Sequence, residues 1–248
     1  MNAPLSPAPP LDATTALRLL REGVWEEQGV IPWSSNYAIL LALRQDDQQG
    51  LAIYKPRRGE RPLWDFPVGT LYLREVAAYL LSETLGWGIV PPTLLRAGPY
   101  GPGSWQIYID SDPEKHFFTL YPDHAAAFRR IALFDLIANN ADRKAGHCLL
   151  DGEGSIWSID HGICFHAEPK LRTVIWEFAG EAIQEAWLHD LQRLHAALTP
   201  GEATQAAFLE LLSPAEVEAL RRRVEALLQT GRYPYPDPNR RNHPWPPI

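Results

Sequence analysis

Two aspartates on either side of a short predicted hairpin are the residues whose placement points most directly to chemistry. Asp142 precedes the apolar run 148–150, and Asp160 follows the apolar run 156–159. The Asp-Gly-Glu-Gly sequence between the runs is typical of a tight turn, and a hairpin brings both of its outer ends to the same edge of a sheet. Carboxylate oxygens gathered in this way favour Mg²⁺ or Mn²⁺ that bridges phosphate oxygens. The sequence therefore predicts a site for a metal-bound phosphate at this hairpin.

A second group of candidate residues lies upstream, where the pattern predicts a small sheet and one helix. Residues 37–43 and 51–54 are apolar runs joined by a polar turn, which indicates a hairpin that ends at Lys55. Residues 73–85 have a helical period and place Glu75 in the first turn. Taken alone, the lysine is a solvated charge and the glutamate an acid favoured by the helix dipole. Their order relative to the two aspartates makes them candidates for the same site.

From residue 122 onward the pattern becomes mainly helical. Residues 125–138 form a strong helical segment, and Ser213-Pro214-Ala215-Glu216 is a capping box that begins a helix ending near Gly231. We therefore expect an α+β fold with two lobes, a small antiparallel sheet followed by a mainly helical part. The expected parts are a flexible leader (1–14), an N-terminal lobe (15–121), a C-terminal lobe (122–232), and a proline-rich tail (233–248) that wraps a surface or is disordered.

Composition argues against several classes of protein. A net charge of −7 disfavours a broad nucleic-acid interface, which relies on clustered Lys and Arg. Cys148 and Cys164 form no CxxC pair, so neither a disulfide framework nor a thiolate zinc site is indicated. The leader does not resemble a secretory signal, and no apolar run approaches the roughly twenty residues of a membrane-spanning helix. We expect a cytoplasmic protein without a membrane span.

Over residues 34–165 the sequence resembles the catalytic core of the phosphatidylinositol 3-/4-kinase-like family, within the protein-kinase-like superfamily, as a divergent bacterial-type member. Asp142-Arg143 matches the family's D-R-x-x-x-N loop. Asp160 matches the family's metal-binding Asp-x-Gly, because it lies in an Ile-Asp-His-Gly sequence that is followed by the aromatic Phe165. The resemblance implies a two-lobed kinase-like fold. It implies that Asp142 accepts or orients the proton of an acceptor hydroxyl, that Arg143 neutralises charge near the transferred phosphoryl group, and that Asp160 holds the metal.

The upstream candidates match the same family in order. Lys55 resembles its ATP-phosphate lysine, and Glu75 resembles the ion-pair partner of that lysine. Residues 107–110, beginning with Ile107, resemble the hinge that binds adenine. The place of a glycine-rich phosphate loop is taken by three small polar residues, Ser34, Ser35 and Asn36, whose backbone N–H groups and side chains would hold the terminal phosphates.

The sequence departs from the family at His147, which stands where the pattern has a metal-binding Asn. Imidazole binds divalent metals but favours softer ions than Mg²⁺. Either the site uses Mn²⁺, or a single Mg²⁺ is held through Asp160, or phosphoryl transfer is weakened. The phosphate loop also has no G-x-G-x-x-G sequence.

The predicted function is an ATP-dependent phosphotransferase that moves the γ-phosphate to a hydroxyl on a protein, a small molecule or a lipid. A nucleotide-binding pseudokinase with a regulatory role is the alternative, raised by His147. A metal-dependent hydrolase built on the histidines near the aspartates is a third possibility. It is disfavoured because no HExxH spacing occurs and because it leaves Lys55 and Glu75 unexplained.

Overall fold

Contacts within the chain divide it into two units, and the computed structural model describes residues 11–31 and 37–248. The first unit comprises Met1–Val76 and Pro91–Asp110, and the second comprises Ala77–Val90 and Ser111–Ile248. We call them the sheet unit and the helical unit. The division differs from the expected boundary after residue 121. It also assigns the segment Ala77–Val90 to the second unit, although the chain returns to the first unit afterwards. The reason is packing, because Ala77, Leu81 and Leu85 belong to the core of the helical unit.

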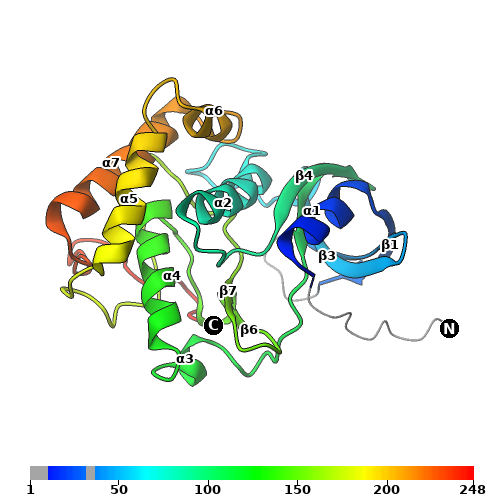
Figure 1. Ribbon diagram of the computed structural model, residues 1–248, viewed down its shortest axis with the longest axis horizontal. Coiled ribbons are helices and arrows are strands. Elements are labelled where there is room, and N and C mark those ends of the chain that lie inside the picture. Colours follow the sequence, from blue (N-terminus) through cyan, green and yellow to red (C-terminus); the bar gives the residue numbers. More distant parts are fainter. Residues whose placement is uncertain (1–10, 32–36) are drawn as a thin grey trace. The chain divides into compact units, whose positions relative to one another are not determined.

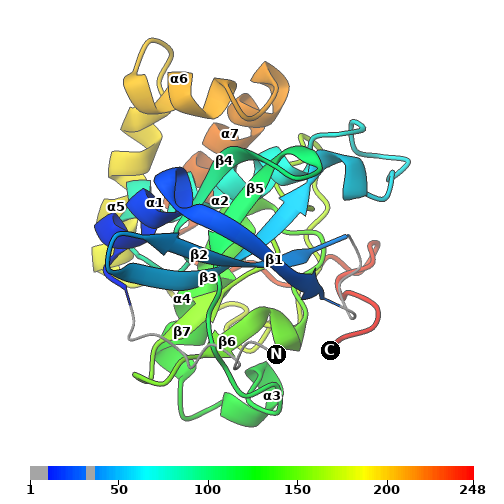
Figure 2. The same cartoon turned by 90° about the vertical axis from the view of Figure 1, so that its right-hand side faces the viewer.

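The sheet unit is an antiparallel sheet covered by one helix. Within the described residues it contains α1 (Ala13–Glu22), β1 (Val24–Val30), β2 (Ile39–Gln45), β3 (Gln48–Pro56), β4 (Thr93–Gly98) and β5 (Gly101–Ile107), with the strand order β1-β2-β3-β5-β4. Leu19 and Leu20 of α1 are fully buried in the core that this helix shares with the sheet, and Figure 2 shows α1 lying beside the strands. Asp12 caps this helix by accepting hydrogen bonds from two backbone N–H groups of its first turn. The unit therefore has a core of its own.

The β2–β3 hairpin is longer than its sequence pattern indicates. Residues 44–50 were expected to form the turn, but Arg44 pairs with Gln49, and the reversal is confined to the residues around Asp46, which has a φ of 52°. Polar side chains on the exposed face of a strand give no apolar run, which is why the pattern ends early. The strand β3 continues to Pro56, where Lys55 pairs with Ser104 of β5.

The helix α2 (Leu71–Leu85) follows the short 3₁₀ helix η1 (Arg57–Gly59) and the division between the units falls within it. It begins two residues earlier than expected, so Glu75 lies in the second turn and not in the first. The early start depends on a contact from outside the helix, because the N–H of Tyr72 donates to the carboxylate of Glu60 at 2.9 Å. A cap of this kind has no local sequence signature.

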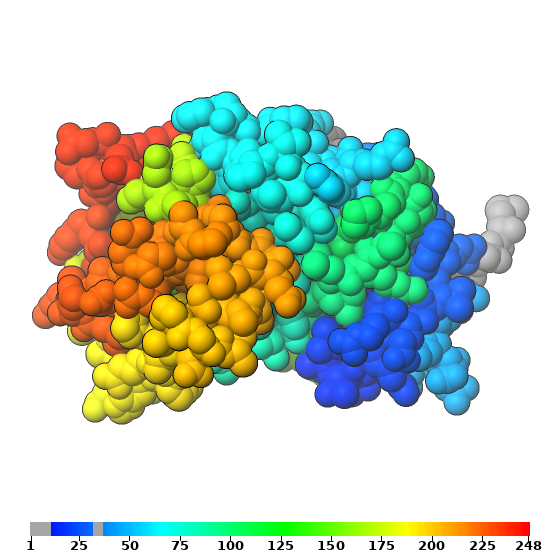
Figure 3. All heavy atoms as spheres, turned by 90° about the horizontal axis from the view of Figure 1, so that it is seen from above, coloured from blue at the N-terminus to red at the C-terminus, as the bar shows by residue number. Residues whose placement is uncertain are grey.

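The helical unit confirms the predicted α+β class. Its elements are α3 (Phe117–Leu120), α4 (Ala125–Ala138), η2 (Ala145–His147), β6 (Cys148–Leu150), β7 (Ile156–Ser158), α5 (Glu185–Ala197), α6 (Ala203–Leu209) and α7 (Pro214–Thr230). The helix α4 and the strand β6 have the predicted bounds, and α7 begins at the predicted Ser213 capping box. Figure 1 shows α4, α5 and α7 beside one another. The segment from Glu185 to Thr230 forms a continuous yellow-to-orange surface in Figure 3.

The proline-rich tail lies on the surface of the helical unit. Tyr233 is buried, and its hydroxyl donates to the carbonyl of Arg129 at 2.9 Å. Further along, the carbonyl of Asn242 accepts a hydrogen bond from the N–H of Thr173 at 3.0 Å, and the carbonyl of Pro247 accepts one from the N–H of Ala145 at 2.8 Å. The extended, surface-wrapping alternative is therefore the one the structure has. No helix in the described ranges has the length and apolar character needed to cross a membrane.

Candidate active site

The predicted ion pair between Lys55 and Glu75 is formed in the sheet unit. The lysine comes from the end of β3 and the glutamate from the second turn of α2, and Nζ lies 2.5 Å from Oε1. The side chain of Glu75 is 4% exposed and that of Lys55 is 18% exposed. A buried carboxylate that faces an ammonium group keeps the lysine in one orientation, because leaving either charge unpaired there would be costly. The binding of ATP phosphates by Lys55 stays a prediction.

The predicted hinge lies where the sheet unit ends. Ile107 is the last residue of β5, and its N–H donates to the carbonyl of Pro92 at 3.0 Å. The next N–H, of Tyr108, donates to the carbonyl of Leu51 at 3.0 Å. Both donors are therefore used within the sheet unit, and an adenine contact would use carbonyl groups or residues beyond Tyr108. The predicted phosphate loop, Ser34, Ser35 and Asn36, lies outside the described residues.

The loop after α4 holds Asp142 by contacts of its backbone. The helix ends at Asn139, which is in the left-handed conformation with a φ of 52°. The N–H of Ala141 donates to Ile163, and the N–H of Arg143 donates to Arg172. The N–H of Asp142 itself donates to the side-chain oxygen of Asn140 at 3.0 Å. Asp142 therefore sits in a loop whose course is determined by partners on both sides.

Arg143 has a different place from the predicted one. It was expected to neutralise charge on the transferred phosphoryl group, but its side chain is fully buried. Its guanidinium donates to the carboxylate of Asp135, at 3.0 Å from Nε to Oδ2, and to the carbonyls of His147 and Ile159. A nitrogen of His161 lies 2.8 Å from Nη2. The correction is that Arg143 is buried and hydrogen-bonded within the helical unit, where its side chain supports the loop.

Charge and burial shift the pKa of Arg143 in opposite directions. Burial opposes its ionisation, whereas the adjacent carboxylate of Asp135 favours it, and the net effect is a raised pKa for Arg143. The guanidinium is therefore a permanent cation, and Asp135 is its counter-ion. Both side chains have zero exposure, so the pair is a structural centre of the helical unit.

Asp160 follows β7 and lies close to Asp142, as the hairpin predicts. The strands pair from Cys148 with Ser158 at their base, which brings the ends of the hairpin together. Burial raises the pKa of the Asp142 carboxyl, the ammonium of Lys144 opposes the increase, and the negative charge of Asp160 adds to it. The charge of Asp160 is therefore close enough to act on the carboxyl of Asp142. The two carboxylates form the acidic part of the candidate site.

The backbone of Asp160 is in the left-handed region, with a φ of 60°. This conformation is uncommon for residues other than glycine, although aspartate tolerates it better than most. Residues held in this region occur often at functional sites, where surrounding contacts determine the backbone. The side chain of Asp160 remains 32% exposed, which leaves it accessible to a ligand.

His147 was predicted as a metal ligand, and the structure engages both of its ring nitrogens with protein groups. Nδ1 accepts a hydrogen bond from the N–H of Lys144 at 3.4 Å, and Nε2 lies 3.2 Å from Oδ2 of Asp160. With Nδ1 as acceptor, the proton of the neutral ring is on Nε2, where it is donated to the aspartate. In this arrangement His147 orients Asp160, and its predicted role as a metal ligand stays a prediction.

The residues of the acidic part fit a hard divalent cation that is shared with phosphate. Asp160 and Asp142 provide carboxylate oxygens, which Mg²⁺ and Mn²⁺ prefer. Across the described ranges there is no group of three or more His, Cys, Asp and Glu side chains with the spacing of a complete metal site. Mg²⁺ is commonly held by one or two carboxylates with substrate phosphates and water completing its shell. The donor set agrees with that kind of site.

Two residues that support the site were not among the sequence candidates. Asp135 projects from α4 toward Arg143, and Asn140 donates to Oδ1 of Asp135 at 2.9 Å while accepting from Asp142. A signal for Asp135 is present, because it is a carboxylate inside the otherwise apolar run 131–138. Asn140 has no such signal, since an Asn after a helix is typical of an ordinary helix end.

Comparisons with known proteins bear on the fold and the family of the chain. No protein-family model matches the chain. The crystal structure of the Helicobacter pylori proinflammatory kinase CtkA is similar in fold, with a TM-score of 0.53 and 12% identity over 86% of this chain and 94% of that chain. Phosphatidylinositol 4-kinase gamma 4 of Oryza sativa is 31% identical over 46% of this chain, a match that spans 24% of the rice protein.

A match to a bacterial protein covers most of both chains. Protein Rv2133c of Mycobacterium tuberculosis is 40% identical, and the match covers 78% of this chain and 81% of that protein. Identity at this level over most of both chains establishes a shared family, whereas the likeness to CtkA establishes the fold alone. The chain therefore has a two-lobed, kinase-like α+β fold and belongs to the family of the mycobacterial protein Rv2133c.

Proposed function

We propose that the chain is an ATP-dependent phosphotransferase of the phosphatidylinositol 3-/4-kinase-like type, which moves the γ-phosphate of ATP to a hydroxyl group. The observation that carries the proposal is the placement of Asp142 and Asp160 at the ends of one hairpin, where the negative charge of Asp160 adds to the raised pKa that burial gives Asp142. The kinase-like fold and the Lys55–Glu75 ion pair support it. The match to the rice phosphatidylinositol 4-kinase supports the assignment to this type.

In this proposal each residue has one task. Lys55, oriented by Glu75, holds the α- and β-phosphates, and Asp160, oriented by His147, holds Mg²⁺ or Mn²⁺. The divalent ion, when bound, neutralises charge on the phosphate oxygens. Asp142 orients the acceptor hydroxyl and accepts its proton, a task that its raised pKa favours because a more basic carboxylate is the better proton acceptor.

The acceptor in this proposal is a hydroxyl on a protein or a small molecule, and a lipid hydroxyl is the third option. The lipid option comes from the family resemblance and from the name of the rice protein, which matches less than half of this chain. Phosphoryl transfer depends mainly on positioning and charge stabilisation, so the same residues serve any of these hydroxyls.

The proposal is tested by incubating the protein with γ-labelled ATP and either Mg²⁺ or Mn²⁺, and by comparing the wild type with Asp160→Ala and Lys55→Ala. We expect metal-dependent binding of ATP and slow release or transfer of label by the wild type, with both reduced at least tenfold in each variant. Glu153→Ala is the matched control, because it removes an exposed carboxylate from the turn of the same hairpin. Failure of the wild type to bind ATP with either metal would contradict the proposal.

A nucleotide-binding pseudokinase is the second candidate, and His147 is the observation that favours it. The imidazole stands where the family has a metal-binding Asn, and it makes a contact with Asp160 instead. In a pseudokinase, Asp142→Ala would leave nucleotide binding and any effect on partners unchanged, while Lys55→Ala would abolish nucleotide binding. In the phosphotransferase, by contrast, Asp142→Ala would abolish the transfer of label from ATP.

A further inference from the structure

We propose that Glu60 is a positioning residue that fixes the start of α2, and through it the orientation of Glu75 toward Lys55. The inference rests on the proposed function, because the Lys55–Glu75 pair is where the nucleotide phosphates would be held. It assigns a role to the loop of residues 57–70, which joins the strand that carries the lysine to the helix that carries the glutamate.

The first turn of α2 depends on Glu60 for a hydrogen-bond partner. The first N–H groups of a helix have no partner within the helix and need acceptors from elsewhere. Thr70, which directly precedes α2, donates its hydroxyl to the carbonyl of Pro67 at 2.7 Å. Oε1 of Glu60 accepts from the N–H of Tyr72 at 2.9 Å, and its negative charge also complements the positive end of the helix dipole.

A second contact joins the same loop to the same helix. The guanidinium carbon of Arg74 lies 4.9 Å from the ring centre of Phe66, and both side chains are buried. Arg74 precedes Glu75 in the chain, so the loop contacts α2 at Tyr72 and again at Arg74. The start of the helix is therefore attached to the loop at two points, and Glu75 follows immediately.

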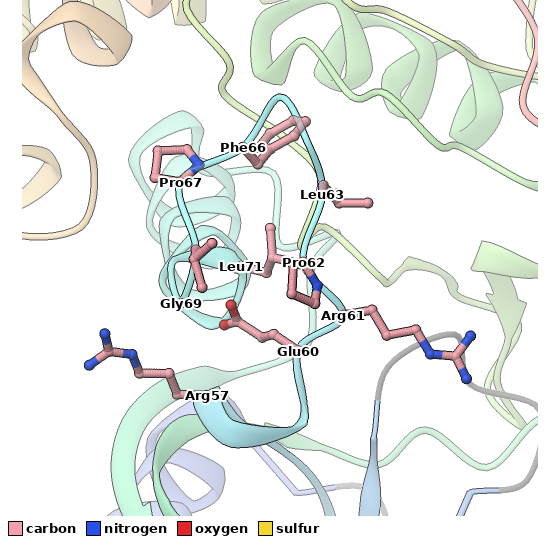
Figure 4. A pocket seen from close by; sticks show the side chains of 10 residues that line it. Arg57, Glu60, Arg61, Pro62, Leu63, Phe66, Pro67, Gly69 and Leu71 are labelled. Atoms are coloured by element: carbon pink, nitrogen blue, oxygen red, sulfur yellow. The ribbon is translucent and has the colours of Figure 1, made fainter.

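The surroundings of Glu60 favour a single position for its carboxylate. Figure 4 shows the side chain pointing toward the first turn of α2, while Arg57 and Arg61 extend away from it on either side. The carboxylate borders a cavity of about 30 Å³ whose apolar lining includes Pro62, Phe66 and Leu71. Oε2 is buried and has no hydrogen-bond partner within the described part of the chain, so the contact with Tyr72 is what holds the carboxylate there.

The experiment compares Glu60→Ala with Glu60→Gln and with a matched control, Asp12→Ala. Asp12 caps α1 in the same unit by a similar contact, and it is remote from α2 in sequence. Glu60→Ala is expected to weaken the binding of ATP with Mg²⁺ about fivefold, the usual effect of losing a helix cap when it is transmitted to a binding group. Glu60→Gln keeps an acceptor oxygen and should restore most of the affinity, and Asp12→Ala should leave it unchanged.

A double-variant cycle separates positioning from general destabilisation. If Glu60 acts through Glu75, Glu60→Ala added to Glu75→Gln causes no further loss of ATP affinity. Independent, additive losses in the double variant would overturn the proposal, as would an equal loss of affinity in Asp12→Ala.

Hydrogen exchange keeps the test independent of the proposed function. In Glu60→Ala the backbone amides of α2 from Tyr72 to Glu75 should exchange at least fivefold faster than in the wild type, whereas Asp12→Ala should accelerate exchange only in α1. If the wild type does not bind ATP, the proposed function fails and the exchange measurement alone decides the role of Glu60. Unchanged exchange at Tyr72 in Glu60→Ala would overturn that role.

Discussion

The sheet unit and the helical unit hold their candidate residues in different ways. In the sheet unit, Lys55 and Glu75 project from a strand and a helix, and one side-chain pair determines how they face each other. In the helical unit, Asp142 and Asp160 lie on irregular backbone whose course is set by hydrogen bonds from distant segments and by the buried pair of Arg143 and Asp135. The first arrangement depends on one largely buried side-chain pair, and the second depends on the backbone partners of its loop and on a second buried pair.

This difference indicates where each arrangement is vulnerable. A change at Lys55 or Glu75 should affect the pair and leave the fold intact, because the sheet is held by its own ladder and by α1. A change at Asp135 or Arg143 should affect the whole helical unit, because those side chains are fully buried. The following predictions test this comparison, from the largest expected effect to the smallest.

The largest effect is expected for Asp135→Ala. It leaves the guanidinium of Arg143 buried without its counter-ion, which costs about 3–5 kcal/mol of the free energy of unfolding. Urea denaturation followed by circular dichroism measures the loss. Glu218→Ala is the control, because it removes a carboxylate from an exposed ion pair on α7 and should cost less than about 1 kcal/mol. Equal losses in the two variants would show that the buried pair contributes no more to the free energy of unfolding than an exposed pair does.

Removal of residues 237–248 tests whether the loop that carries Asp142 is supported by the tail. Three hydrogen bonds accepted by tail carbonyls are lost, from Ala145, Thr173 and the indole of Trp176. The expected cost is about 2 kcal/mol, confined to the helical unit. Hydrogen exchange should become faster at Ala145 and Thr173 and stay unchanged in the β2–β3 hairpin. Faster exchange in both regions would contradict the separation of the two units.

Glu75→Gln tests the ion pair between Lys55 and Glu75 in the sheet unit. The amide keeps a hydrogen-bond acceptor for Lys55 but removes the charge, so the expected loss of stability is about 1 kcal/mol. Thermal unfolding measures it, with Glu26→Gln on the exposed strand β1 as the control that should change nothing. A loss as large as that of Asp135→Ala would remove the contrast between the two units.

The smallest effect is expected for Asp142→Asn, and it should depend on pH. The pKa of Asp142 is raised in the folded protein by burial and by Asp160, against the opposing charge of Lys144. The folded state therefore binds more protons than the unfolded state just above the ordinary aspartate pKa, and stability falls as the pH rises through that window. Asp142→Asn should be slightly more stable than the wild type near neutral pH.

The gain should disappear at a pH below both pKa values, where the wild-type carboxyl is protonated in the folded and the unfolded state. Denaturation at several pH values measures it. Stabilisation that is equal at every pH would show that the charge of Asp142 is not the cause.

Local patterns predicted the regular elements well. The bounds of α4 and β6 and the Ser213 cap of α7 follow from periodicity and capping residues, which are properties of neighbouring residues. The start of α2 was predicted two residues late, because its cap, Glu60, comes from a separate loop. A contact between segments that are distant in sequence has no local signature in the sequence of either segment.

The site shows the same limit. The aspartates and the Lys55–Glu75 pair were identified by their order along the chain and by a family resemblance. The burial of Arg143 was not, because it depends on Asp135, which enters from a helix packed beneath the loop. The engagement of His147 with Asp160 was also missed, since both orientations of the ring are compatible with the sequence.

The contact between Ala145 and Pro247 has a consequence for how the protein is made. A ribosome releases the chain from its N-terminus onward, so α4 and the hairpin emerge well before the tail that completes them. Until residue 247 is free, the amide of Ala145 has no carbonyl from the tail to bond with. The loop that carries Asp142 thus acquires this backbone partner only after residue 247 has left the ribosome, so a nascent chain has its sheet well before it has a finished site.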